Sequence, residues 1–579
     1  MAKKTKASSP LSLSYEGFGG IGAKDSHNGA ISDLVNLRVC ADGSLRKRSG
    51  YKAVYSSDKE IRAIWSGYIG GSFECYFLAG RGIYSLDIAT GEATLKTSIP
   101  QSEGKAQFFY FRDYLYLIDG INIYRLRDSY AISIKGYVPL FGKDWDAGYP
   151  GQINEPLNIL HRHARITYKI GESVSAYLPT MYPVATIDAL YKNGELVDPA
   201  SYEFDTRFNT INLSGLATGD KLEANVTFVD DEAQAAARAE LLTSKYACVF
   251  GGINSTRLFL WNGESKNKIF SSLYVDEASE AASDARYAGS GPLYFVEGSS
   301  FTVGDGRYNV KAVTRHFDRL LILTDGDAWI ANSTTTGLEE FPIMSINSSI
   351  GCSSEQAVAL IGNDPVSVGR QAIYRWTSDT DEYSECNAYS ISEPISDMLD
   401  TFFYQNARVF YDKRRDEIWL SDPTSDGCVW IFSPKNDAWF RFERISATDF
   451  FDADGEVGFS DGYSLYIFDP SLHADFDTVG AESGRAIIGE LVFDLSDFGY
   501  AGYKRLLQAT LRADTPDAAI TLTLTTDRGE VIEKTVIGRG AHDVITRRIH
   551  SHRFKTLETK LSMRGDAMQI LHSLEINTR

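Results

Sequence analysis

A hydrophobic period of two dominates this chain, in short runs rich in Tyr, Phe, Val, Ile and Trp. Clear examples are YLYLI (residues 114–118), RLFLW (257–261), CVWIF (428–432) and SLYIF (464–468). Asp, Gly, Asn and Ser bound these runs, and two runs often flank one short turn. This period and this turn chemistry are typical of β-hairpins, so the sequence predicts an all-β protein with few short helices.

The hairpins recur every ~35 to 60 residues between residues 50 and 475, too loosely for a strict repeat. Each unit has the order strand, turn, strand, polar turn, which is typical of degenerate β-propeller blades. We count about six or seven blade candidates in this region. A series of separate β-sandwiches is the alternative, but no linker rich in Pro, Gly or Ser interrupts the pattern.

Two segments depart from the blade pattern. Around residues 160–232 the strands differ, and Asn193-Gly194 is a strong two-residue hairpin turn, so we expect a small inserted β-sandwich. DDEAQAAARAELLTSK (230–245) follows, with acids at its start and Lys at its end, which predicts a helix. After about residue 476 a second sandwich is expected, with near-ideal alternation in ITLTLT (520–525).

These patterns give a domain prediction for the whole chain. The expected parts are an N-terminal arm with first strands (1–50), a discontinuous β-propeller (51–158 and 246–475), an inserted β-sandwich (159–232) with a return helix (233–245), and a C-terminal β-sandwich (476–579).

The composition favours a large folded core and argues against a protein that grips nucleic acid. Aromatic residues make up 12% of the chain and charged residues only 23%. The net charge, 58 − 77 = −19, opposes binding through phosphate contacts, although it permits a surface past which DNA slides. We interpret the small basic run Arg46-Lys47-Arg48 as part of a structured turn, since Asp42-Gly43 precedes it and Gly50 follows it.

The segment MAKKTKASSPLSLS (1–14) has a basic tip without an apolar core, so we expect no secretory signal but an arm that orders against a neighbour. No apolar run reaches the ~18 residues of a transmembrane helix, so membrane insertion is not expected. The six cysteines are far apart and include no C-x-x-C.

Several residue groups could carry chemistry, and we interpret each as structural. The histidine pairs could hold a metal only with a third ligand, the acidic pairs suit strand turns, and the glycine run suits close backbone packing. The sequence therefore predicts a protein that is not an enzyme, with no catalytic, cofactor-binding or metal site and no cofactor. The groups are His161/His163, His550/His552, Asp452/Asp454, Asp379/Asp381 and the run from Gly17 to Gly22.

The segment DLVNLRVCADGSLRKRSGY (33–51) resembles a pattern in virion proteins of tailed double-stranded DNA bacteriophages. There an aspartate and an Asn-Leu pair precede Gly-x-Leu-x-x-Arg-Pro-Gly, and this chain has Ser49 in place of the proline. The resemblance continues in YVP (137–139), EPLNIL (155–160), the stretch 254–271 and VGDG (303–306).

Among these virion proteins, the chain most resembles the tail nozzle of short-tailed phages, which is a propeller with inserted and appended β domains. It implies a structural virion protein that forms a homo-oligomeric ring, a hexamer, beneath the adaptor and portal-side proteins. The genome would pass through its lumen without specific binding, and tail fibres or spikes would dock on it. It would be made in the host cytoplasm and reside in the phage tail. The alternatives are a receptor- or glycan-binding propeller module of the tail tip and a polysaccharide-degrading enzyme.

Overall fold

The predicted all-β class is confirmed by the computed structural model, whose described part consists of many small sheets with few short helices. The chain divides into two compact units, Met1–Ala79 with Tyr84–Thr94 and Ser349–Arg579, and Gly80–Ile83 with Leu95–Ser348. The structure describes residues 11–16, 18–23, 30–100, 104–127, 130–133, 136–146, 151–172, 176–177, 182–251, 256–286, 290–332, 342–377, 387–399, 403–421, 427–516, 518–538, 540–541 and 543–579.

The first unit contains blade-type groups of four strands, and in most of these groups the order of the strands follows the chain. They are formed by β5 (Gly50–Ser56), β6 (Ile61–Ile69), β7 (Ser72–Ala79), β8 (Gly82–Leu86), β9 (Ala93–Ser98), β30 (Val358–Ile361), β31 (Asp364–Val368), β32 (Ile373–Thr377), β33 (Asn387–Ser390), β34 (Arg408–Asp412), β35 (Glu417–Ser421), β36 (Cys428–Ser433), β37 (Ala438–Glu443), β38 (Asp449–Ala453), β39 (Glu456–Ser460) and β40 (Ser464–Asp469). Strand β9 and the start of β8 extend into residues grouped with the second unit.

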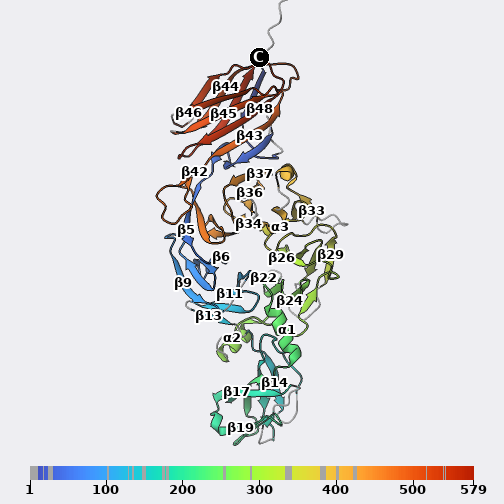
Figure 1. The fold of residues 1–579 in the computed structure, drawn as a ribbon. Helices are drawn as coiled ribbons and strands as arrows, with labels where there is room; N and C mark the ends of the chain where they lie inside the picture. The colour runs from blue at the N-terminus through green and yellow to red at the C-terminus, as the bar shows by residue number, and fades with distance from the viewer. Residues whose placement is uncertain are drawn as a thin grey trace, which may run out of the picture. The chain divides into compact units, whose positions relative to one another are not determined.

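The sheets of the first unit are arranged as propeller blades are. Strands β30, β34, β38 and β6, each the first of its sheet, are neighbours in that order. Figure 1 labels β34 and β6 of this series. Strand β5, near the start of the chain, pairs antiparallel with β40 and so completes the sheet β38–β39–β40–β5. Side chains from facing sheets share one core, for example Phe77 of β7 and Phe451 of β38.

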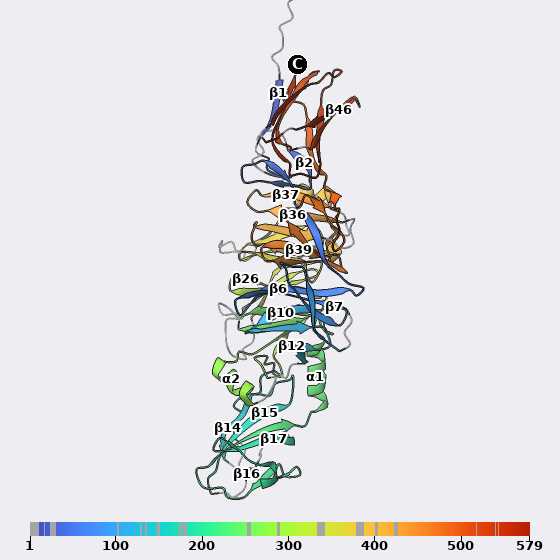
Figure 2. The same ribbon diagram turned by 90° about the vertical axis from the view of Figure 1, so that its left-hand side faces the viewer.

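The second unit repeats the blade arrangement. Figure 2 labels three of its blade strands, β10, β12 and β26. The blade strands are β10 (Gln107–Phe111), β11 (Tyr114–Ile118), β12 (Ile123–Arg127), β13 (Tyr130–Ser133), β22 (Tyr246–Phe250), β23 (Arg257–Trp261), β24 (Lys268–Ser271), β25 (Ser300–Thr302), β26 (Val310–His316), β27 (Arg319–Thr324), β28 (Ala328–Asn332) and β29 (Ile343–Asn347). First strands β10, β22 and β26 are again neighbours, and Trp261 and Ile322 belong to one core between adjacent sheets. Aromatic residues of the blades thus pack between adjacent sheets.

The predicted inserted sandwich lies in the second unit and has its own core. Its sheets are β14–β15–β21–β17–β18 and β16–β20–β19. The Asn193-Gly194 turn joins β17 and β18 with φ of 52° and 89°, as a two-residue hairpin of type I′ requires. The strands are β14 (Leu140–Asp146), β15 (His163–Lys169), β16 (Ala176–Tyr177), β17 (Val184–Lys192), β18 (Glu195–Leu196), β19 (Tyr202–Asp205), β20 (Thr210–Leu213) and β21 (Lys221–Phe228).

The inserted module begins earlier than the expected residue 159. Strand β14, which fell within the predicted propeller segment 51–158, pairs in parallel with β15. Phe141 and Trp145 of β14 are buried in the core of the module together with Phe228 of β21. Burial of these large rings places β14 in the module rather than in a blade.

The C-terminal sandwich also includes strands from the other end of the chain. One sheet is β3–β4–β49–β44–β47 with β1 beside β49, and the other continues from β37 through β2–β43–β48–β45–β46. The alternation in 520–525 is confirmed, since Ile520, Leu522 and Leu524 are buried. The strands are β1 (Leu11–Glu16), β2 (Ile31–Val35), β3 (Leu37–Val39), β4 (Leu45–Lys47), β43 (Gly489–Ser496), β44 (Leu506–Asp514), β45 (Ala519–Thr526), β46 (Val531–Ile537), β47 (Asp543–Arg548), β48 (Leu557–Arg564) and β49 (Ile570–Thr578).

The described part of the expected N-terminal arm pairs with strands of its own chain. Strand β1 pairs in register with β49, from Leu11 opposite Thr578 to Glu16 opposite Ser573. Ile21 bridges to Trp439, and β2 pairs with β43. Backbone hydrogen bonds within the same chain hold this segment, because an edge strand exposes unpaired N–H and C=O groups that a neighbouring strand can satisfy.

Helices are few and short. Helix α1 (Glu232–Leu242) forms within the predicted helical segment, and Asp231 caps it by accepting from the Gln234 N–H. The others are α2 (Glu277–Arg286), α3 (Phe403–Asn406) and the 3₁₀ turns η1 (Pro199–Ser201) and η3 (Glu393–Met398), and two short strands, β41 (Ala474–Asp475) and β42 (Arg485–Ala486), pair with each other. In the described part of the chain, no helix is long and apolar enough to cross a membrane.

Candidate functional site

The segment 33–51, which carries the family resemblance, forms the end of β2, the β3–β4 hairpin and the start of β5. The turn of the hairpin is stabilised by contacts between neighbouring residues. Asp42 accepts hydrogen bonds from the N–H and the hydroxyl of Ser44, and Gly43 has a φ of 79°. Register pairs Arg38 directly with Arg46 across the hairpin. The segment lies between blade β34–β37 and the sandwich sheets of the same unit.

Asp33 and Asn36 connect this segment to strand β37. Asp33 accepts two hydrogen bonds from the Arg441 guanidinium, at 3.0 and 2.7 Å. Asn36 is buried with a φ of 51°, a left-handed conformation that Asn tolerates better than most residues. Its side-chain oxygen accepts from the Glu443 N–H and from Arg48 Nε, so one amide joins three segments.

Arg48 forms the most deeply buried ion pair of the segment. Its Nη1 and Nη2 donate to the two Asp475 carboxylate oxygens at 2.8 and 2.7 Å, and both side chains are 2% exposed. A two-bond guanidinium–carboxylate pair is strong and directional, and breaking it would leave a buried charge. Arg48 thereby fixes the start of β5 to β41.

Lys47 is fully buried, and its ammonium donates to the Gly565 carbonyl. Burial lowers the pKa of Lys47 to about 8, against the opposing attraction of Asp566. The basic run Arg46-Lys47-Arg48 therefore forms strand β4 and the residue after it rather than a turn. Two of its three cations, Lys47 and Arg48, are inside the protein.

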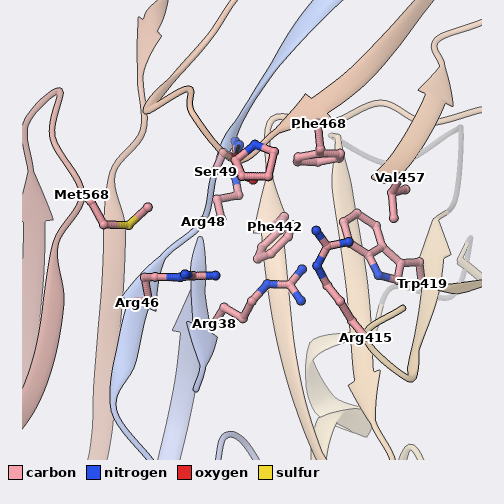
Figure 3. Close-up of a pocket in the computed structure, with 11 residues that line it drawn as sticks. Arg38, Arg46, Arg48, Ser49, Arg415, Trp419, Phe442, Val457, Phe468 and Met568 are labelled. Atoms are coloured by element: carbon pink, nitrogen blue, oxygen red, sulfur yellow. Dashed lines mark hydrogen bonds between the residues drawn. The ribbon is translucent and has the colours of Figure 1, made fainter. Parts of the chain in front are cut away.

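We refer to the cavity beside this hairpin as the arginine cavity. It has a volume of about 60 Å³. Figure 3 shows the Arg46 side chain extending toward Arg38, with the Arg415 guanidinium and the Phe442 ring close by. Its lining residues are Arg38, Arg46, Arg48, Ser49, Arg415, Trp419, Phe442, Val457, Phe468, Pro470 and Met568.

Three of the four lining arginines have carboxylate partners. Arg38 Nη1 donates to both Glu417 oxygens, at 2.5 and 2.6 Å, and its guanidinium lies 5.9, 5.7 and 5.5 Å from the ring centroids of Trp419, Phe440 and Phe442. Arg48 is paired with Asp475, as described above. Arg415 donates to Asp412 and Glu456; burial would lower the pKa of Arg415, but these two carboxylates raise it.

The ion pairs around the arginine cavity connect distant segments of the chain, and the guanidinium groups at the cavity are suited to binding an anion. The buried pairs join residues 33–48 to residues 417–475 of the same unit. The open side of the cavity offers guanidinium N–H groups, which bind carboxylate and phosphate oxygens. None of the lining residues is an acid, a histidine or a cysteine.

The histidines of the two pairs have different surroundings. His161 Nε2 lies 3.0 Å from the Tyr137 carbonyl, whereas His163 Nδ1 lies 3.2 Å from Asp188. His552 pairs with Glu530 at 3.1 Å, and His550 is exposed. Among the described residues no group of three or more His, Cys, Asp or Glu side chains could hold a metal ion.

The acidic pair Asp452/Asp454 and the glycine run have turn and packing roles. Asp452 accepts from the Gly455 N–H, and Asp454 has a φ of 55°, so both belong to the turn between β38 and β39. Asp379 and Asp381 lie outside the described residues. A Cβ on Gly20 would come within 3.0 Å of the Trp439 carbonyl, so the glycine run permits close packing, against its own chain.

Sequence reasoning missed the carboxylates that complete this site. Glu417 lies 379 residues from its partner Arg38, and Asp475 lies 427 residues from its partner Arg48. Glu456 lies 41 residues from its partner Arg415, on a strand of another sheet. The chain has 77 acidic residues, and the sequence around these three does not distinguish them from the others. The available signal was the pair of arginines at 38 and 48 within predicted strands, since arginines buried in a sheet require partners.

Comparisons with known proteins give only distant structural similarity. No family model matches the chain, and no curated protein sequence matches it. Among solved structures, the extracellular domain of a protein described as a one-component system of B. thetaiotaomicron has 11% identity and a TM-score of 0.27 over 92% of this chain and 62% of that one. The chain thus spans less than two thirds of that structure.

An exo-β-1,3-galactanase from Phanerochaete chrysosporium has 7% identity and a TM-score of 0.24, over 92% of this chain and 100% of that one. A structure titled glycoside hydrolase has 11% identity and a TM-score of 0.20, over 91% and 99%. With TM-scores far below 0.5, none of these similarities bears on the activity or ligand of this chain.

Proposed function

We propose that this chain is a structural subunit of a bacteriophage tail, a nozzle or channel protein that assembles as a homo-oligomeric, hexameric ring. In this proposal the adaptor and portal-side proteins bind one end of the ring, fibres or spikes dock on it, and the genome passes through its lumen. The residues that resemble tail proteins carry the proposal. Asp33, Asn36, Arg38 and Arg48 are engaged in internal ion pairs and hydrogen bonds.

This use of the motif supports a mechanical role. Forming a buried ion pair costs desolvation energy, but the pair fixes the relative position of the two segments that it joins. Such pairs therefore suit a junction that must keep its geometry while force acts on the tail. A catalytic motif would instead place polar side chains toward an open cleft. The net charge of −19 is compatible with a conduit that does not hold DNA.

The test is to purify phage particles that carry an affinity-tagged copy of this chain and to image them after labelling the tag. We expect label at the tail and, for the purified protein alone or with its adaptor, rings in electron micrographs. Particles without label, together with a monomer of 64.2 kDa in light scattering both alone and with the adaptor, would contradict the proposal.

A second candidate is a receptor- or glycan-binding module of the tail tip, favoured by two exposed tyrosines near the end of the sandwich. Tyr500 and Tyr503 are 53% and 51% exposed. Arg528 and Lys555 lie 4.9 and 5.2 Å from the Tyr503 ring. Exposed rings flanked by cations suit stacking on acidic sugars. Binding on a glycan array that Tyr503→Ala abolishes would favour this candidate, and binding unchanged by Tyr503→Ala would not.

A further inference from the structure

Among the four arginines that line the cavity, Arg46 is the one for which the described part of the chain provides no counter-ion. It lies directly opposite Arg38 in the β3–β4 hairpin, and like charges directly opposite in a sheet destabilise it. Arg38 is compensated by Glu417, with side chains 14% and 8% exposed. Arg46 is exposed, and among the described residues no carboxylate or other acceptor binds its side chain.

Arg38 also keeps hydrogen-bonding capacity on its free side. Both bonds to Glu417 come from Nη1, and no described residue accepts from its Nε or Nη2. The rings of Trp419, Phe440 and Phe442 surround the guanidinium and hold its plane in place. A preorganised guanidinium with unused donors is well suited to bind an incoming oxyanion.

The cavity has the size and walls for a small anion. A volume of about 60 Å³ compares with the ~10 to 15 Å³ that one water requires in the same measure, so the space admits several waters or one small ion. Trp419, Phe442 and Phe468 form apolar walls. Apolar walls lower the local dielectric constant and strengthen an ion's attraction to the guanidinium groups.

We propose that the arginine cavity binds one small oxyanion, held between the guanidinium groups of Arg46 and Arg38. The chemical class is a phosphate or carboxylate group, either as a free ion or as the end of an acidic side chain. Such an ion would relieve the repulsion between the two arginines and add a bond between β3 and β4. The inference stands independently of the proposed tail function, because it concerns the isolated chain.

The experiment measures thermal unfolding of the full chain in sodium phosphate, sodium acetate and sodium chloride at equal ionic strength and pH, with calorimetric titration of phosphate. We expect phosphate to raise the Tm of the wild type above its value in chloride. The acetate arm reports whether a carboxylate group is also bound. Arg46→Gln should weaken phosphate binding about ten- to a hundredfold, as the loss of charged hydrogen bonds predicts.

Two variants control the result. Arg307→Gln removes an exposed arginine, 70% accessible and paired with Asp305 in the other unit, and should leave the phosphate effect unchanged. Arg46→Lys keeps the charge but not the guanidinium fork, so it should retain part of the binding. The proposal is overturned if neither phosphate nor acetate stabilises the wild type beyond chloride, or if Arg46→Gln responds as the wild type does.

Discussion

At the scale of single residues, Arg48 and Lys47 illustrate two outcomes of burying a cation. Arg48 meets Asp475 in a two-bond pair and keeps its charge inside the protein. Lys47 meets only the Gly565 carbonyl at its ammonium, and burial lowers its pKa to about 8. The difference matters for stability, because an unpaired buried charge costs more than a paired one.

We predict that Arg48→Met lowers the free energy of unfolding by about 3 to 5 kcal/mol, because Asp475 would be left buried without its main partner. Calorimetry should detect this as a lower Tm of the transition that includes the first unit. The double variant Arg48→Met/Asp475→Leu should recover much of the loss. Arg307→Met, which breaks an exposed pair, should change stability by less than about 1 kcal/mol. Equal effects of Arg48→Met and Arg307→Met would contradict the prediction.

Lys47 predicts a pH dependence. Its folded pKa of about 8 lies below the ~10.4 of an unfolded lysine, so the unfolded state binds more protons between these values. The contribution of Lys47 to stability should therefore rise as the pH increases from about 8 to about 10. Lys47→Met removes this titration. The Tm of the wild type relative to that of Lys47→Met should increase over this range, and a constant difference would count against a lowered pKa.

At the scale of elements, the first strands of the chain complete structures built from its last third. Strand β1 extends the sheet of β49, and β5 completes the sheet of β38–β40. Each pairing satisfies a row of backbone groups on an edge strand that would otherwise be open to other chains. The N-terminal segment is thus an integral part of the sandwich and of one blade.

Deletion of residues 1–22 should therefore destabilise the C-terminal sandwich as well as any assembly. It removes β1 and the bridge between Ile21 and Trp439. Hydrogen exchange should show reduced protection of β49, with the blades of the second unit unchanged. Deletion of residues 1–10 alone keeps β1 and serves as the control. Full protection of β49 in the longer deletion would mean that β1 adds nothing to the sandwich.

The inserted sandwich offers a separate test, because its core is formed by its own strands. We predict that residues 138–230, expressed alone, fold cooperatively. Trp145 is the one tryptophan in this range and is 4% exposed, so its emission should be blue-shifted and should shift red on unfolding in urea. Emission typical of exposed tryptophan without denaturant would show that the module requires the blades.

At the scale of the whole molecule, charge is the property most relevant to a DNA conduit. With −19 per chain and two of the three cations of the basic run buried, we expect no binding to double-stranded DNA. In gel mobility shifts at about 50 mM salt the purified chain should leave DNA unretarded. Binding that weakens steeply with added salt would reveal several phosphate contacts and contradict this prediction.

The sequence by itself determined the properties that depend on near neighbours. The period of two predicted strands, Asn193-Gly194 predicted its hairpin, and residues 520–525 predicted which side chains are buried. Acids before and Lys after an alanine-rich stretch predicted α1. Each of these signals arises within about ten residues, where backbone geometry and side-chain direction are fixed by local chemistry.

Only the tertiary structure decided the pairings between distant segments. The sequence could not place β1 beside β49, β14 in the inserted module, or β5 beside β40. Nor could it identify Glu417 and Asp475 as the partners of Arg38 and Arg48. These contacts depend on which sheet edges remain open once the blades and the sandwich have formed, and neither the edge nor the register is encoded in the residues next to it.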